Sequence, residues 1–139
     1  MAAVTWRIHF FRRHPEDDPD ETVPPMTFLD SIPVAARAEI IAVLEAVAEA
    51  PPPSFSGGGK WEAMHDGMAG FYEVRVHGAD RRNHRLFCVL EREAKDLGGS
   101  SIVCIDGLSK PPRQAANPKD YRRALRYRKE FQRRRTVLR

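Results

Sequence analysis

Alternating hydrophobic positions predict the first strand. In residues 4–11, VTWRIHFF, the side chains of Trp6, Ile8 and Phe10 share one face, and β-branched and aromatic residues dominate. Residues 14–26, HPEDDPDETVPPM, follow without an apolar period and are rich in acid and proline. This composition predicts a solvated loop that acts as a disordered connector.

A helical period begins after Met26. The segment TFLDSI predicts one short turn of helix, and Pro33 suits the start of a longer one. From Val34 to Ala50 nearly every residue is a good helix former. Within this segment the apolar residues that recur at spacings of three and four are Ile40, Ile41, Val43, Leu44 and Val47. We therefore expect an amphipathic helix that docks by one face. The three prolines at 51–53 end it, and SFSGGG predicts a flexible connection.

Three strand-like runs follow, at 70–76, 84–91 and 101–108. The segments that join them, HGADRRN and EAKDLGGS, are short, which predicts an antiparallel meander. Because side chains alternate along a strand, the first run presents two different faces. One face holds Tyr72, Val74 and Val76, and the other holds Phe71, Glu73 and Arg75. One side of the sheet is therefore expected to be partly charged.

Capping signals mark the last helix. Asn117 is a favoured N-cap, Pro118 a favoured first helical residue, and Asp120 places a carboxylate in the first turn. The residues expected to dock on the sheet are Tyr121, Leu125 and Phe131, and those expected to face water are Arg122, Arg123, Arg126, Lys129, Arg133 and Arg134. Beyond Gln132 we expect the run RRRTVLR to fray.

These elements predict an α+β fold, in which an antiparallel meander sheet packs with a long N-terminal helix and a basic C-terminal helix. The 139 residues suit a single domain at 1–135, followed by a frayed basic tail at 136–139. No apolar run approaches the length of a membrane span, and Arg7 and His9 interrupt the stretch where a signal peptide would be apolar. We therefore expect a cytoplasmic protein that does not contact a membrane.

The two cysteines, Cys88 and Cys104, each lie within an apolar run. This position predicts small buried residues that stay reduced, rather than a disulfide framework. The sequence has no C-x-x-C motif and no His/Cys cluster with ligand spacing, so neither a structural metal nor a small-molecule cofactor is expected.

The net charge of +4 conceals an asymmetry. Residues 119–139 hold ten of the 23 Lys and Arg residues but two of the 19 Asp and Glu residues. This segment therefore carries a net +8, and residues 1–118 carry −4. A local field of that sign attracts phosphate backbones or an acidic partner, and it weakens steeply with salt.

Motifs of several enzyme classes are missing: the sequence has no G-x-S-x-G, phosphate-binding loop, dinucleotide fingerprint or H-E-x-x-H. It does place basic and aromatic residues on or just after neighbouring strands and at the start of the last helix, namely Lys60, Trp61, His65, Arg75, Arg85, Lys110, Arg113 and Tyr121. Cutting RNA without a metal requires a base for the ribose 2′-hydroxyl, cations for the phosphate and an acid for the leaving oxygen. Arg and Lys supply cations, and aromatic rings stack on splayed bases.

Each of these residues also has a purely structural interpretation. Arg75 could form a surface ion pair with Glu73 or another nearby acid. His65 could be a solvated loop side chain. Tyr121 could be a core aromatic of its helix, and Trp61 could simply be packed. The residues alone leave both interpretations open.

Four motifs occur in a particular order along the chain. They are FLDSIP at 28–33, KWEAMHDGMAGFYEVRV at 60–76, HRLFCVLE at 84–91 and GLSKP at 107–111. On these motifs and on the order of its elements, the segment 27–130 resembles the phage-derived, HigB-like branch of the RelE/ParE toxins. The resemblance covers about three-quarters of the chain. It implies the toxin of a type II toxin-antitoxin system. In that superfamily, RelE and HigB members cut mRNA in the ribosomal A site, whereas ParE members inhibit gyrase.

The resemblance also implies roles for individual residues. Arg75 and Arg85 occupy the basic positions of the second and third strands of such toxins. Lys110, with Arg113 as the alternative, follows the last strand, and Tyr121 corresponds to an aromatic residue that takes part in catalysis in RelE. These correspondences make Arg75, Arg85 and Lys110 the expected phosphate ligands.

The acid/base assignment stays open among His65, Glu73 and Tyr121. Glu73 stands where RelE has a further lysine, as is common in the phage-derived branch, and it could act as a base or orient Arg75. The residues expected to contact RNA are Lys60, Trp61, Arg113, Arg122, Arg126 and Lys129.

The leading hypothesis is therefore a metal-free, ribosome-dependent mRNA endonuclease. Two alternatives are a ParE-like gyrase inhibitor that acts by binding, and a phage-derived RNA-binding module without catalysis. The expected partners are a cognate antitoxin with a helix-turn-helix, the ribosome and mRNA. A further hypothesis is that the acidic segment 16–21 shields the basic surface.

Overall fold

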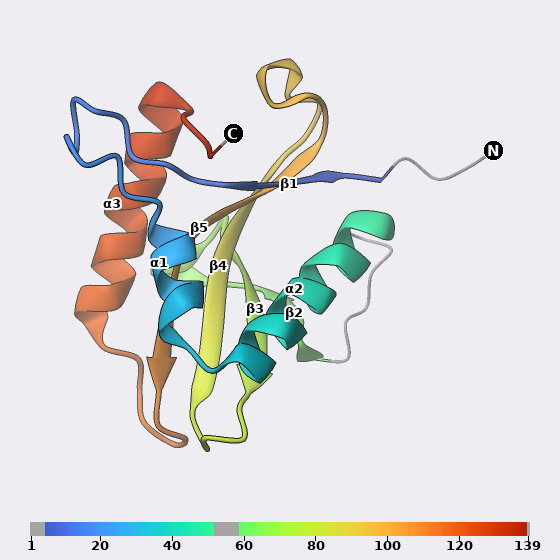
Figure 1. Cartoon of the computed structure of the whole chain (residues 1–139), viewed down its shortest axis with the longest axis vertical. Helices are drawn as coiled ribbons and strands as arrows, with labels where there is room; N and C mark the ends of the chain where they lie inside the picture. Colours follow the sequence, from blue (N-terminus) through green and yellow to red (C-terminus); the bar gives the residue numbers. More distant parts are fainter. Residues whose placement is uncertain (1–4, 52–58, 139) are drawn as a thin grey trace.

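The computed structural model describes residues 5–51 and 59–138. A mixed five-stranded sheet forms its centre, in the strand order β1-β5-β4-β3-β2 (Figure 1). The strands are β1 Arg7–Phe10, β2 Trp61–Ala63, β3 Tyr72–His77, β4 Asn83–Glu91 and β5 Ser101–Lys110, and the helices are α1 Pro24–Ser31, α2 Val34–Glu49 and α3 Pro118–Arg134, with short 3-10 helices η2 Asp66–Met68 and η3 Lys95–Leu97. The predicted α+β class is confirmed. Of the predicted connection SFSGGG, only Gly59 lies within the described residues.

The helices cover opposite faces of the sheet. We call the face packed against α1 and α2 the front, and the face packed against α3 the back. The meander is confirmed, because β4 pairs antiparallel with both β3 and β5. Two pairings were not predicted: β1 lies parallel to β5, and β2 extends the sheet beyond β3. None of the described helices has the length and apolarity needed to cross a membrane.

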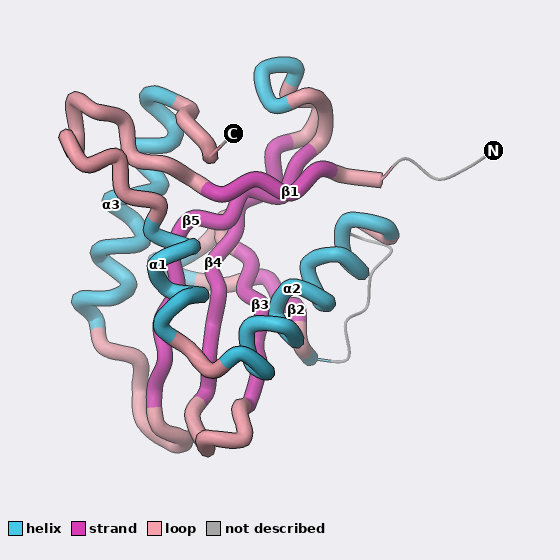
Figure 2. The backbone as a smooth tube through the Cα atoms, viewed as in Figure 1, coloured by secondary structure: helices cyan, strands magenta, loops and turns pink. Residues whose placement is uncertain are grey.

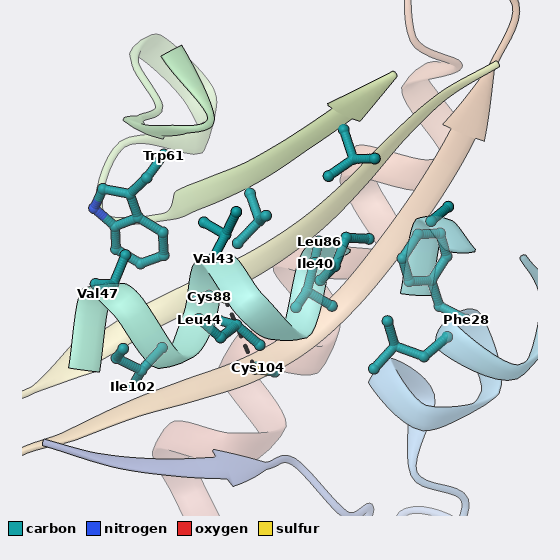
Figure 3. Packing of buried hydrophobic residues seen from close by; sticks show 14 of the residues in the cluster. Phe28, Ile40, Val43, Leu44, Val47, Trp61, Leu86, Cys88, Ile102 and Cys104 are labelled. Carbon is teal, nitrogen blue, oxygen red and sulfur yellow. Dashed lines mark hydrogen bonds between the residues drawn. The ribbon is translucent and has the colours of Figure 1, made fainter. Parts of the chain in front are cut away.

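The front core confirms the amphipathic helix (Figure 3). Ile40, Leu44 and Val47 of α2 are fully buried against the sheet. Cys88 and Cys104 are cross-strand neighbours in this core, with their Sγ atoms 3.9 Å apart as free thiols. Burial raises the pKa of the Cys88 thiol. The prediction of buried, unbridged cysteines is therefore confirmed.

A close approach between α1 and β5 depends on a glycine. At Gly107, a Cβ atom would lie 2.3 Å from Cδ2 of the Phe28 ring, which is far inside van der Waals contact. Only a residue without a side chain therefore lets α1 pack this closely on the strand. The glycine of the GLSKP motif thus has a packing role.

The back core confirms the last helix. The Asn117 side chain accepts a hydrogen bond from the backbone N of Lys119 at 3.0 Å, and α3 begins at Pro118 as predicted. The residues predicted to dock, Tyr121, Leu125 and Phe131, all pack in this core. Phe131 is fully buried and meets the ring of Phe11 edge-on at 6.2 Å between centroids.

The prediction of a disordered connector at 14–26 is wrong. Helix α1 begins at Pro24, so the predicted single turn extends to eight residues. Before it, the Asp18 carboxylate accepts hydrogen bonds from the backbone N of Asp20 at 3.0 Å and of Thr22 at 3.1 Å. Figure 2 shows this loop beside the C-terminal end of α3. Its order comes from turns closed by a side chain, which leave no apolar period in the sequence.

The expected fraying beyond Gln132 is also wrong. Helix α3 continues to Arg134, and Arg135 then bonds to the carboxylates of Glu91 and Asp96. Val137 is 4% exposed and forms a β-bridge with Phe11. The backbone N of Leu138 donates to the Phe10 carbonyl at 2.8 Å. The chain thus returns to β1 and closes the back core.

Candidate active site

Charged side chains gather on the back face of β3 and β4. Arg75 and Arg85 are direct cross-strand partners, and Glu73 lies on the same face, one alternation earlier on β3. Glu73 Oε1 is 3.6 Å from Arg75 Nε, and Glu73 Oε2 is 3.8 Å from Arg85 Nη1. The structure therefore brings together three of the residues selected from the sequence, on the face that the alternation predicted.

The Glu73 carboxyl group is buried and lies near two positive charges. The residue is 7% exposed, and its Oε2 accepts no hydrogen bond within the described part of the chain. Burial raises the pKa of Glu73, and the nearby positive charges of Arg85 and Arg75 only partly oppose this effect. Both guanidinium distances exceed hydrogen-bonding range. The carboxyl group is therefore held beside two cations without being locked to either.

An open pocket of about 470 Å³ adjoins this carboxyl group. The predicted catalytic residues that line it are His65, Glu73, Arg85 and Tyr121. His65 is exposed and directly precedes η2, whereas Tyr121 is half-buried with its ring 5.9 Å from that of Phe87. The structure therefore assembles every candidate for proton transfer around one space. We call this space the first pocket.

A second pocket of about 280 Å³ continues toward the β3–β4 turn. It shares Arg85 and Glu62 with the first pocket and adds Arg75, His77 and Asn83. Glu62 Oε2 accepts a hydrogen bond from Arg75 Nη1 at 3.0 Å, which fixes the guanidinium at the edge of the pocket. Arg75 thus forms a surface ion pair with Glu62, and it also lines the second pocket.

The remaining predicted cations on the meander lie farther out. Lys110 Nζ donates to the Gln114 carbonyl at 2.7 Å, and its charge opposes the rise in the pKa of Glu73 that burial causes. Lys110 therefore acts on the site through its field. Arg113, its alternative, is exposed in a turn at φ 65° and lines neither pocket.

Two of the predicted RNA contacts lie away from the site. Trp61 pairs with Val74 and faces the front core, where it is 6% exposed and stacks on Tyr72 at 5.2 Å. Little of this ring is exposed to stack on a nucleobase, so the geometry favours the packed interpretation of Trp61 over its expected contact with RNA. Lys60 Nζ bonds to Glu39 Oε1 of α2 at 2.8 Å.

The outer surface of α3 is basic, with one correction. Arg122, Arg126 and Lys129 are exposed as predicted. Arg123 is not a purely solvated side chain, because its Nε donates to Asp106 Oδ2 at 2.8 Å. Asp106 is 3% exposed, and its pKa is raised by burial against the opposing effect of Arg123. Arg123 therefore neutralises a buried acid.

The C-terminal end of α3 is paired with the acidic loop. Asp17 Oδ1 lies 3.2 Å from Arg133 Nη2, and Asp17 Oδ2 lies 3.2 Å from Arg134 Nε. Glu16 Oε2 lies 2.9 Å from Arg134 Nη1. Arg133 and Arg134 are exposed, as predicted, but their charges are already compensated. The acidic segment 16–21, which we call the acidic loop, therefore neutralises the cations at the C-terminal end of α3. Three exposed cations lie nearer the start of the helix, and we call them the basic row: Arg122, Arg126 and Lys129.

Sequence reasoning missed two groups near the site. Glu62 orients Arg75, but β2 spans only three residues and gave no strand signal. His84 is 1% exposed, with Nδ1 2.7 Å from Ser109 Oγ and Nε2 3.1 Å from both Asp80 oxygens. This buried imidazole fastens the β3–β4 turn to β5 beside Arg85. Only the spacing of four between Asp80 and His84 could have indicated the contact.

Within residues 5–51 and 59–138, no group of three His, Cys, Asp or Glu side chains is arranged to hold a metal ion. Comparison of the chain with protein-family models, with curated proteins and with solved structures finds no match. The geometry of the back face therefore carries the functional argument.

Proposed function

We propose that this chain is the toxin of a type II toxin-antitoxin system and acts as a metal-free, ribosome-dependent mRNA endoribonuclease. The observation that carries the proposal is the buried carboxyl group of Glu73, which lies 3.6 and 3.8 Å from the guanidinium groups of Arg75 and Arg85 at the wall of an open pocket. The resemblance of residues 27–130 to the HigB-like toxins supports the same activity.

In the proposed reaction, Glu73 takes the proton of the ribose 2′-hydroxyl. The 2′-oxygen then bonds to the adjacent phosphorus, the bond from phosphorus to the 5′-oxygen breaks, and a 2′,3′-cyclic phosphate forms. Arg75 and Arg85 stabilise the charge that develops on the phosphate. A raised pKa suits Glu73 to this role, because a base works best when its pKa lies near the working pH.

The leaving 5′-oxygen needs a proton from the opposite side of the phosphate. His65 and Tyr121 are the candidates, since both line the first pocket with Glu73. His65 is the more exposed of the two and can exchange protons with solvent directly. We assign it the role of acid, with Tyr121 positioned against the substrate.

The basic row supplies the docking surface in this proposal. Arg122, Arg126 and Lys129 follow one another at spacings of four and three along α3, so they lie on one exposed stripe of the helix. Such a stripe attracts the phosphate backbone of ribosomal RNA. An antitoxin with an acidic contacting surface would cover the same cations and keep the toxin inactive.

The proposal is tested by expressing the chain in cells and mapping mRNA 5′ ends. We expect cuts within codons at the ribosomal A site, and we expect Arg75→Ala combined with Arg85→Ala to abolish them. Arg133→Ala combined with Arg134→Ala removes the same number of charges outside the pockets and should leave cutting intact. Toxicity without A-site cuts, or full activity of the Arg75/Arg85 double variant, would overturn the proposal.

A further inference from the structure

The connection between β2 and β3 carries His65 and forms part of the first pocket. We call residues 64–71 the His65 loop. Backbone hydrogen bonds close this loop: the N of Met64 donates to the Phe71 carbonyl at 2.9 Å. The N of Met68 donates to the His65 carbonyl at 3.1 Å. Several residues of the loop line the first pocket, and α3 lines the same pocket through Tyr121. The shape of the pocket therefore depends on how this loop is held against α3.

The imidazole of His65 has no contact of its own that would fix it. The side chain is exposed, does not cap η2, and forms no hydrogen bond or ion pair within residues 5–51 and 59–138. In the proposed reaction His65 must nevertheless reach the leaving 5′-oxygen while Glu73 reaches the 2′-hydroxyl. The position of the imidazole is therefore set by the backbone that carries it, and so by the contacts that hold the His65 loop.

Arg128 of α3 joins the His65 loop to the helix. Its Nη1 donates to the Ala69 carbonyl at 2.9 Å. Its guanidinium carbon lies 4.4 Å from the centroid of the Phe71 ring, which is fully buried. Gly70 stands between these two contacts at φ 96°, and a Cβ atom there would lie 3.0 Å from Arg128 Nη1. The loop thus surrounds one guanidinium group closely.

The charge of Arg128 is not paired with an acid. The side chain is half-buried, and burial lowers the pKa of Arg128 without opposition from any carboxylate of the described residues. A planar guanidinium can donate to a carbonyl and lie over an aromatic ring at the same time. The contacts made by Arg128 therefore point to a geometric role, which is to tie the His65 loop to α3.

We propose that Arg128 is a positioning residue for the leaving-group step, because it holds the His65 loop where His65 faces the 5′-oxygen of the scissile phosphate. This inference rests on the proposed endoribonuclease function. In that step the bond from phosphorus to the 5′-oxygen breaks, its electron pair stays on the oxygen, and a proton passes from His65 to that oxygen. Arg128 lines neither pocket, so its loss should impair this protonation alone.

The test separates protonation of the leaving group from the rest of the reaction. Ribosomes are programmed with two mRNAs that differ only in the bridging atom at the mapped cut site, which is the normal 5′-oxygen or a sulfur. A thiol has a pKa of about 8.5, so a thiolate leaves without receiving a proton. A misplaced acid therefore slows cutting of the oxygen linkage and leaves cutting of the sulfur linkage near the wild-type rate.

Arg128→Met removes the donor to Ala69 and keeps an unbranched stem beside Phe71. We expect it to cut the oxygen linkage about tenfold more slowly than the wild type, against about 10²-fold for His65→Ala, and to cut the sulfur linkage at the wild-type rate. Arg92→Met is the matched control. Its guanidinium carbon lies 5.2 Å from the centroid of the Trp6 ring and outside both pockets, so both linkages should be cut normally.

Arg128→Lys replaces the methionine variant if circular dichroism shows that the latter does not fold. Lysine keeps the charge and most of the stem, but it cannot bond to the carbonyl and lie flat on the ring together. We expect a smaller loss on the oxygen linkage and again no loss on the sulfur linkage.

The outcomes separate the two proposals. Equal losses on both linkages in the Arg128 variants, or no loss on either, would overturn the positioning role and leave the endoribonuclease in place. An equal loss on both linkages in His65→Ala would do the same, because His65 would then not be the acid. A wild type that makes no A-site cuts in the oxygen mRNA would overturn the proposed function, and the positioning role with it.

Discussion

Two buried carboxyl groups on the back face, those of Asp106 and Glu73, differ in how they are compensated. Asp106 is 3% exposed and receives a hydrogen bond from Arg123 at 2.8 Å. Glu73 is 7% exposed, and its guanidinium neighbours stand at 3.6 and 3.8 Å without bonding to it. Burial raises the pKa of both carboxyl groups, so burial alone does not distinguish them.

The difference shows what separates a structural acid from a reactive one. Arg123 also bonds to Asp120 and to the Gly107 carbonyl, so Asp106 belongs to a hydrogen-bonded network that joins α3 to β5. The carboxyl group of Glu73 has cations nearby and an open pocket beside it. A buried charge that is fully bonded fixes the fold, whereas one left without hydrogen bonds can exchange a proton with a substrate.

The largest expected effect is on cutting. Glu73→Gln keeps the shape of the side chain but removes the base, so we expect the cutting rate to fall by about 10²–10⁴-fold. Because burial raises the pKa of Glu73, folding penalises its ionised form, so a neutral glutamine should not lower the stability near pH 7. The measurements are A-site cutting on purified ribosomes and thermal unfolding by circular dichroism.

Asp106→Asn is the matched control for that change. It neutralises the second of the two carboxyl groups, whose side chain lines neither pocket, so cutting per folded molecule should persist. A Glu73→Gln variant that still cuts at the wild-type rate would remove Glu73 from the mechanism. The comparison between the two carboxyl groups would then have no functional meaning.

Unlike Glu73→Gln, the substitution of Arg123 should lower the free energy of unfolding. Arg123→Ala leaves the buried Asp106 carboxylate without its cation, which costs about 3 kcal/mol, at the low end for a broken buried pair because Arg123 is partly exposed. Arg122→Ala, one residue away on the exposed side, should change the free energy of unfolding by less than about 0.5 kcal/mol. Urea denaturation measures both. Equal effects of the two substitutions would show that the Asp106 network is not structural.

The basic row allows a similar comparison along α3. Arg122→Ala with Arg126→Ala removes two exposed cations of the basic row. The negative slope of log affinity for purified ribosomes against log salt should therefore become shallower by about 1.5, as expected for two lost phosphate contacts. Arg133→Ala with Arg134→Ala removes cations already paired with Asp17 and Glu16, and its slope should stay near the wild-type value. If the slope changes equally in the two double variants, the acidic loop does not neutralise Arg133 and Arg134.

The elements with a strong local period were predictable, and the contacts between distant segments were not. The meander, α2 and the start of α3 followed from alternation, helical spacing and a capping residue. Glu73 and Arg75 shared the predicted face because a strand alternates strictly. The parallel pairing of β1 with β5 and the bridge from Val137 to Phe11 join opposite ends of the chain, which no local pattern encodes.

The site was predictable in part for the same reason. Residue type and strand position identified Arg75, Arg85 and Glu73 as candidate site residues. They could not show that Trp61 packs in the front core instead. The side of the sheet on which a three-residue strand places Trp61 depends on its register with β3, which is a tertiary property. The partner of Arg123 could not be predicted either, because its contact with Asp106 joins α3 to β5 and depends on how the two elements pack.

The smallest expected effect concerns the pH dependence of cutting. As a base, Glu73 must be ionised, so the rate should fall as the pH drops through its pKa, which burial places above the usual value for a glutamate. The charge of Glu62 raises this pKa and that of Lys110 lowers it. Glu62→Gln should therefore move the acidic limb of the rate profile to lower pH, and Lys110→Gln should move it to higher pH. Single-turnover cutting rates at constant ionic strength resolve these displacements. Shifts of the same sign in both variants, or no shift in either, would contradict the assignment of the acidic limb to Glu73, because these two charges move its pKa in opposite directions.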